Sequence, residues 1–217
     1  MNYKELLKWA SHYMPGYEVY DLALSMISKY DVDSEEAIAG IFMLLFCWNK
    51  GYYQEKPFSY ADEHISRFRE VIRSEKKYIL PLRNERIEKV DLNKTIEELG
   101  VTIRESIYHL FSALKFLGST GVSKALHLLL PHLMVMWDSR IREFYRIGSS
   151  VNDFLEFQVK MKRELEEAIA SYMEEFKVSE DEAILKILRM KYGDNLRPLT
   201  KLVDEYNWVI ASRRTAR

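Results

Sequence analysis

The chain of 217 residues has a single cysteine, Cys47. One cysteine cannot form a disulfide within the chain, and such usage is typical of proteins from reducing compartments. Cys47 lies in the apolar run 41–48, where a free cysteine packs like a small apolar side chain, so we interpret it as a core residue. Glutamine is almost absent, while Glu, Lys, Arg and Tyr are plentiful, a composition that favours a heat-loving source.

Long uncharged apolar runs are also missing. The longest nearly uncharged stretch, 37–48, is shorter than the roughly 20 residues with which a helix crosses a bilayer. The first fourteen residues mix charged and apolar positions and lack the order of a signal peptide, which is basic, then apolar, then small. We therefore expect a cytoplasmic protein without a membrane partner.

The phosphate-binding and hydrolase motifs are absent. No glycine-rich loop ends in Gly-Lys-Ser/Thr, and neither Gly-x-Gly-x-x-Gly nor Gly-x-Ser-x-Gly occurs. The five histidines include no His-Glu-x-x-His pair, and one cysteine cannot hold an iron–sulfur cluster. The sequence argues against P-loop, Rossmann and α/β-hydrolase functions, and we expect neither a metal nor a cofactor.

Helical periodicity is what the sequence does contain, along nearly its whole length. Apolar residues recur at helical spacing, capping residues precede many of these segments, and none shows the sustained alternation of a strand. We predict an all-α fold of about nine to twelve helices. Because the predicted loops are short, we expect one compact domain over 1–217, or two helical lobes, 1–100 and 101–217, that share a cleft.

Two local predictions matter for the site. Residues 91–93 are predicted to begin a helix that Gly100 ends. Residues 118–121, Gly-Ser-Thr-Gly, are predicted to form a tight turn between a helix that ends at Leu117 and one that begins at Val122.

Charge is unevenly distributed, although the formal net charge is only −1. Residues 101–163 hold nine Lys/Arg and five Asp/Glu, whereas residues 164–182 are strongly acidic. The simplest interpretation is two solvated helix faces. The alternative is a phosphate-facing patch made by Lys124, Arg140, Arg142 and Arg146.

The most distinctive string is SKALHLLLPHLMVMWDSRIREFY, residues 123–145. It resembles a signature of poorly characterised prokaryotic helical proteins, with Ser-Lys, Leu-His, Pro, Met-Trp-Asp, Ile-Arg and Tyr in the same order. Trp48-Asn49 and residues 204–208, Asp-Glu-Tyr-Asn-Trp, fit the same resemblance. The resemblance implies an all-helical fold but no particular activity.

A more distant similarity is to the helix-hairpin-helix DNA glycosylases. In those enzymes the amides of a glycine hairpin hold a DNA phosphate, and Gly118 and Gly121 correspond to that hairpin. Lys124 corresponds to the lysine that attacks the sugar. Asp138 corresponds to the carboxylate that stabilises positive charge on the sugar, and Arg142 to an arginine on the helix that follows. The similarity implies DNA binding with Schiff-base chemistry at Lys124. Two features depart from that pattern: the glycines are three apart instead of two, and the Lys124–Asp138 interval is shorter than usual.

Each of these residues also has a purely structural interpretation. Asp138 is placed to cap the following helix, Lys124 could be a solvated residue at a helix start, and Met134, Met136 and Trp137 suit a core. A non-enzymatic interaction protein or homo-oligomer is therefore the alternative function, with a partner covering the aromatic residues Tyr52, Tyr53, Phe58 and Trp208. A small-molecule enzyme with an all-α cleft is a third class, for which the sequence indicates no substrate.

Overall fold

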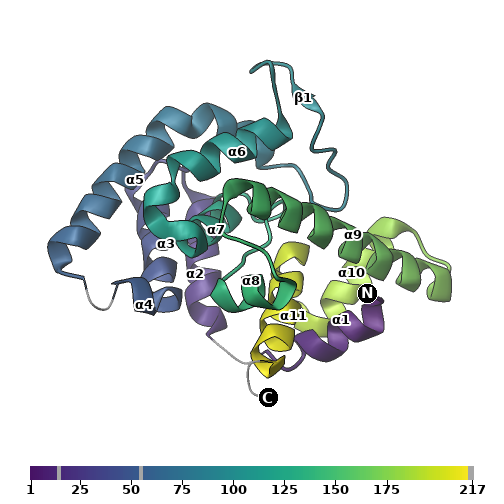
Figure 1. Cartoon of the computed structure of the whole chain (residues 1–217). Helices are drawn as coiled ribbons and strands as arrows, with labels where there is room; N and C mark the ends of the chain where they lie inside the picture. Colours follow the sequence, from purple (N-terminus) through teal and green to yellow (C-terminus); the bar gives the residue numbers. More distant parts are fainter. Residues whose placement is uncertain (14–15, 54–55, 215–217) are drawn as a thin grey trace. The chain divides into compact units, whose positions relative to one another are not determined.

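The computed structural model describes residues 1–13, 16–53 and 56–214, with Lys50, Phe58 and Arg214 described by their main chain alone (Figure 1). This part of the chain forms eleven α-helices, two short 3-10 helices and one antiparallel pair of two-residue strands. The predicted all-α fold is confirmed. No helix among the described residues is long and apolar enough to cross a membrane.

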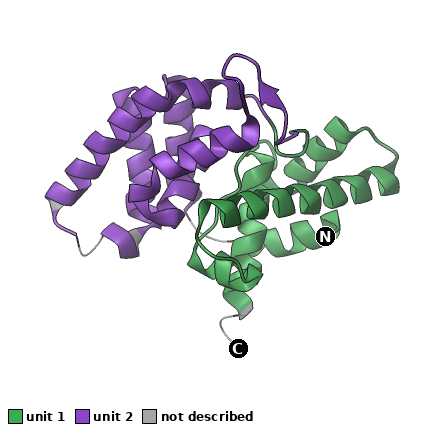
Figure 2. Cartoon of the chain, turned by 45° about the horizontal axis from the view of Figure 1, so that its top comes forward, with its two compact units in different colours: residues 1–14, 86–90, 131–217 green, residues 15–85, 91–130 purple. Residues whose placement is uncertain are grey.

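The chain divides into two units, each assembled from separated segments (Figure 2). Unit 1 comprises Met1–Met14, Arg86–Val90 and Pro131–Arg217, and unit 2 comprises Pro15–Glu85 and Asp91–Leu130. These bounds differ from the expected lobes 1–100 and 101–217. The N-terminal helix joins the C-terminal ones by tertiary packing, which a division at one point of the sequence cannot represent.

Unit 1 contains α1 (Tyr3–Ala10), α8 (Ser139–Tyr145), α9 (Val151–Phe176), α10 (Glu180–Tyr192) and α11 (Leu199–Arg214). Helix α1 packs against α9, α10 and α11, and α8 packs against α11. Leu6 and Ala10 of α1 are fully buried, four residues apart on one face, as a short amphipathic helix requires.

Unit 2 contains α2 (Tyr17–Lys29), α3 (Glu35–Trp48), α4 (Lys50–Tyr53), α5 (Phe58–Ile79), η1 (Leu80–Leu82), α6 (Ile103–Ala113), η2 (Lys115–Leu117) and α7 (Gly118–Leu129). Helix α3 begins where Ser34 accepts a hydrogen bond from the amide of Ala37. It is apolar nearly all round because α2, α5 and α7 all pack against it.

The predicted helix from residue 91 to Gly100 is wrong. This segment contains a small hairpin in which β1 (Thr95–Ile96) pairs antiparallel with β2 (Val101–Thr102). The Asp91 carboxylate accepts from the amide of Asn93, which favours a turn over a helix, and Gly100 takes a positive φ of 65°. Helix α6 then begins with a capping box between Thr102 and Glu105.

The predicted turn at 118–121 is also displaced. The chain reverses through η2, and Gly118 is already the first residue of α7, so residues 118–121 form the first turn of that helix. Gly118 has φ 70° and ψ 154°, a conformation that is easily adopted by glycine alone. A side chain here would also meet the ring of Tyr52 at 3.4 Å.

The segment before α8 is buried although it is not helical. Leu133, Met134, Val135, Met136 and Trp137 are each at most 2% exposed. The interpretation of Met134, Met136 and Trp137 as core residues is confirmed.

Candidate functional site

Lys124 is buried within unit 2. It lies on α7 with only 8% of its surface exposed, and its ammonium donates to the main-chain carbonyl of Trp48. Trp48 is the last residue of α3, so this carbonyl belongs to the final turn, whose oxygens have no partner within the helix. The interpretation of Lys124 as a solvated residue is therefore wrong.

Two buried rings, those of Tyr20 and His127, lie beside the partner of Lys124. The ring of Trp48 stacks on that of Tyr20, with planes 9° apart and centroids 5.9 Å apart. The Tyr20 hydroxyl lies 2.8 Å from Nε2 of His127, and both residues are fully buried. Trp48 and His127 belong to the signature-like segments, so the tertiary structure explains part of the pattern as packing around the α3–α7 contact.

Asp138 has the structural role that its position predicts. It is the N-cap of α8, and its carboxylate accepts a hydrogen bond of 2.8 Å from the amide of Ile141. Asp138 belongs to unit 1 and Lys124 to unit 2.

The three arginines of the predicted phosphate patch lie on or next to α8. Arg140 and Arg146 are exposed, and Arg146 ends the helix in the left-handed conformation with φ 55°. Arg142 differs from both, because its guanidinium carbon lies 5.6 Å from the centroid of the Trp137 ring. Its Nε is buried and has no hydrogen-bond partner among the described residues.

A second aromatic cluster lies beside the start of α7. We define the aromatic cluster as Tyr52, Tyr53, Tyr60, His64 and Phe116. The Tyr52 hydroxyl donates to the Phe116 carbonyl at 2.8 Å. Because its only proton is used there, the Tyr60 hydroxyl, 2.8 Å away, donates to Tyr52.

Cations and half-exposed rings alternate over this aromatic cluster. The guanidinium of Arg67 lies 4.5 Å from the centroid of Phe116, and the ammonium of Lys56 lies 5.2 Å from that of Tyr60. Burial raises the pKa of Tyr52 to about 12 and lowers that of His64, so both side chains are uncharged near neutral pH.

No family model, curated protein or solved structure matches this chain. The resemblances noted from the sequence therefore stay predictions, and the geometry of the side chains has to carry the functional argument.

Lys201 is a second buried lysine, in unit 1. It lies on α11, fully buried, with its ammonium 2.7 Å from the carboxylate of Asp204 and 3.7 Å from that of Glu205. Burial opposes its charge, but these carboxylates outweigh burial and hold the pKa of Lys201 well above its usual value. Lys201 is thus fixed as an ammonium, whereas Lys124 donates to a main-chain carbonyl.

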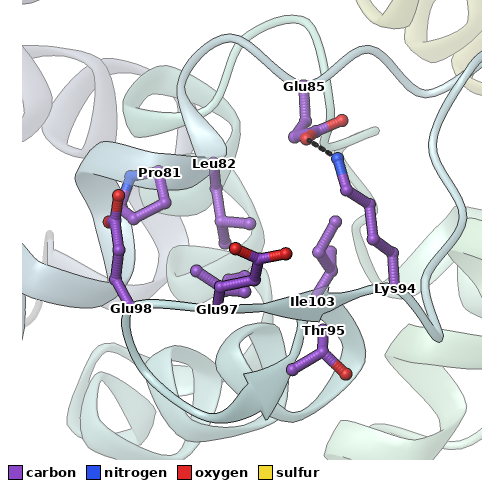
Figure 3. A pocket seen from close by; sticks show the side chains of 9 residues that line it. Pro81, Leu82, Glu85, Lys94, Thr95, Glu97, Glu98 and Ile103 are labelled. Atoms are coloured by element: carbon purple, nitrogen blue, oxygen red, sulfur yellow. Dashed lines mark ion pairs between the residues drawn. The ribbon is translucent and has the colours of Figure 1, made fainter.

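A pocket of about 460 Å³ opens beside the β1–β2 hairpin (Figure 3). Leu82 and Ile103 line it with apolar surface, and Glu97 projects into it. The single lysine in its lining, Lys94, is paired with Glu85 at 3.6 Å. Its uncompensated charge is negative, so this pocket does not suit a phosphate, and it contains none of the residues singled out from the sequence.

Among the residues that the structure describes, no group of three or more His, Cys, Asp and Glu residues could hold a metal ion. The residues that sequence reasoning missed are Tyr20, Tyr60, His64 and Phe116. The aromatic density of residues 46–60 was the available signal, but the contribution of Phe116 depends on tertiary packing.

Proposed function

We propose that this protein acts on DNA through an amine nucleophile, Lys124, in chemistry of the glycosylase and abasic-site lyase class. The observation that supports it is the state of Lys124, which is withdrawn from water and bonded to a main-chain carbonyl. An enclosed lysine is the type of side chain that forms Schiff bases with carbonyl substrates, its amine acting as the nucleophile.

The proposed step is the attack of the Lys124 amine on C1′ of a deoxyribose. With a damaged nucleotide, the bond from C1′ to the base breaks and its electron pair leaves with the base, which takes up a proton that the amine loses. The bond from C1′ to the ring oxygen O4′ then breaks, O4′ takes up a proton from water, and the nitrogen lone pair forms the C=N bond. With an abasic site, the amine adds to the C1′ aldehyde and the adduct loses water. Both routes give the same iminium ion, which borohydride reduces to a stable secondary amine by adding hydride to carbon.

Asp138 enters this proposal through the sequence resemblance, as the carboxylate that stabilises positive charge on the sugar. The cap that it makes on α8 is compatible with this role, because the cap uses one carboxylate oxygen, Oδ1. Arg140 and Arg146 are exposed cations that would contact the DNA backbone.

Borohydride trapping tests the proposal. The full chain is incubated with an oligonucleotide that contains one abasic site, once as a single strand and once in a duplex. The mixture is reduced and separated on a denaturing gel, and the crosslinked residue is mapped by mass spectrometry. We expect one adduct at Lys124 that Lys124→Arg abolishes, since arginine can still donate to the Trp48 carbonyl but is not a nucleophile.

Two other lysines serve as controls. Lys29, the last residue of α2 in the same unit, is exposed, and Lys29→Met should leave the adduct unchanged. Lys201 should carry no adduct, because its carboxylate partners keep it protonated. Adducts spread over exposed lysines, or an adduct that persists in Lys124→Arg, would overturn the proposal.

A further inference from the structure

We infer that the aromatic cluster around Phe116 is a stacking surface for unpaired bases, and that the nucleic-acid partner of this protein is engaged as a single strand. This inference rests on the proposed function for the class of partner. It adds a binding surface in unit 2 that is separate from the nucleophile and contains none of the residues singled out as catalytic.

The rings remain partly open to solvent. Tyr52, Tyr53, Tyr60 and Phe116 are all half-buried, whereas the comparable rings of a core, such as Tyr20 and Phe68, are fully buried. Half-buried rings that are held in place by hydrogen bonds offer a rigid apolar surface, and stacking of a base on such a ring tolerates any sequence because every base has a π-face.

The internal bonds of the cluster explain its order. Tyr60 donates to Tyr52, which donates to the Phe116 carbonyl, and the ring of His64 lies 4.2 Å from that of Tyr60. The hydroxyls thus satisfy one another and a main-chain oxygen. A base that stacks here would displace little ordered polar structure.

Charge around the cluster suits a phosphate backbone. Arg67 and Lys56 each lie over a ring, and Lys115 is exposed one residue before Phe116. Asp62 and Glu63 are opposing charges, directly before His64 in the sequence and exposed on α5. Alternation of aromatic rings with arginine and lysine is the arrangement by which proteins bind single strands without sequence preference.

The cluster is continuous with the region around Lys124. Helix α4, which carries Tyr52 and Tyr53, follows within two residues of Trp48, whose carbonyl accepts from Lys124. The ring of Tyr52 also lies against Gly118, the first residue of the helix that carries Lys124. A strand stacked on the cluster would therefore pass close to the start of α7.

Binding of two oligomers of equal charge tests this inference. One is fluorescein-labelled dT15, and the other is a 15-unit strand of tetrahydrofuran abasic phosphates, which keeps the backbone and lacks the bases. If bases stack on the cluster, the full chain should bind dT15 at least about tenfold more tightly than the abasic strand, as measured by fluorescence anisotropy. Equal affinity for the two strands would mean attraction to the backbone only, and would overturn the inference.

Three variants localise the effect. Tyr60→Leu and Phe116→Leu remove a ring but keep apolar volume, and each should weaken dT15 binding about tenfold. Tyr108→Leu is the matched control, because Tyr108 is 46% exposed on α6 of the same unit but lies outside the cluster, and it should bind like the parent. Circular dichroism checks that each variant is folded.

The outcomes separate this inference from the proposed function. Base-dependent binding without an adduct at Lys124 would retain the stacking surface and reject the chemistry. An adduct at Lys124 together with dT15 binding that Tyr60→Leu and Phe116→Leu leave unchanged would retain the chemistry and reject the stacking surface. A dimer in sedimentation velocity that Tyr60→Leu dissociates would assign the cluster to a second copy of the chain and overturn the inference.

Discussion

Gln158 bonds both main-chain groups of Val135: its Oε1 accepts from the Val135 amide at 2.8 Å, and its Nε2 donates to the Val135 carbonyl at 2.9 Å. Val135 lies in a buried stretch that is not helical, so water and helix partners are both missing there. Gln158, which is 2% exposed, takes the place of a neighbouring strand. Further bonds hold the preceding residues, from the Ile87 amide to the His132 carbonyl and from Thr200 to that of Pro131.

Substitution of this glutamine should be costly. Gln158→Leu keeps the volume but leaves a buried amide and a buried carbonyl unsatisfied, so we expect the free energy of unfolding to fall by about 3 kcal/mol. Urea denaturation measures this free energy of unfolding. Arg163→Gln, at an exposed site on the same helix, should change the free energy of unfolding by less than about 0.5 kcal/mol. Equal stability of the two variants would show that the Val135 bonds contribute little.

The buried charges of α11 make a second prediction. The Glu205 carboxylate is fully buried, 3.3 Å from the ammonium of Lys191, and accepts a hydrogen bond from Tyr192. Glu205→Ala removes negative charge beside the buried ammonium of Lys201 and the half-buried one of Lys191, and should lower the free energy of unfolding by roughly 3–5 kcal/mol.

The control for that variant is an exposed ion pair in the same unit. Lys4 and Glu175 are 2.7 Å apart and both exposed, so Lys4→Ala should leave the urea midpoint unchanged. A midpoint for Glu205→Ala as high as that of Lys4→Ala would contradict the importance of the buried network.

Alkaline pH should destabilise unit 1. Burial raises the pKa of Tyr13 to about 12, and the Lys201 ammonium lies 4.3 Å from the centroid of its ring. Above pH 10 the unfolded chain loses the Tyr13 proton while the folded chain keeps it, so this contribution is complete below pH 10 and is lost as pH rises towards 12. For Tyr13 alone the loss is about 1 kcal/mol between pH 10 and pH 11.

Urea unfolding at a series of pH values checks this dependence, together with the tyrosinate absorbance at high pH. Tyr13→Phe should make the loss of stability above pH 10 less steep. A variant whose stability falls as steeply as that of the parent would place the alkaline sensitivity in other groups.

Two substitutions of Asp138 separate its cap from its charge. Asp138→Ala removes the acceptor for the Ile141 amide and should cost about 1 kcal/mol of stability. Asp138→Asn keeps an oxygen acceptor, so its free energy of unfolding should lie within about 0.5 kcal/mol of that of the parent. If the carboxylate stabilises positive charge on the sugar, both variants lose release of a damaged base; full base release by Asp138→Asn would restrict Asp138 to its cap.

The helices could be predicted from the sequence because their signals are local. Ser34 and Asp138 cap the helices that follow them, and each bond is made within three residues of the capping side chain. The hairpin at residues 95–102 was missed because strands this short have no period, and their pairing depends on the turn between them. The start of α7 was misplaced because Gly118 serves as a helix start with unusual dihedral angles and also as a contact for Tyr52.

The candidate site likewise has features that depend on neighbouring residues in the sequence and others that depend on tertiary contacts. The sequence by itself determined the helical class, the cap at Asp138 and the aromatic wealth of residues 46–60, since each depends on neighbours along the chain. Only the tertiary structure decided that Lys124 is buried against the end of α3, that Gln158 completes the segment around Val135, and that Phe116 joins Tyr52 and Tyr60. These contacts join residues 23 to 76 positions apart, and whether a side chain is desolvated depends on such contacts, which no local pattern specifies.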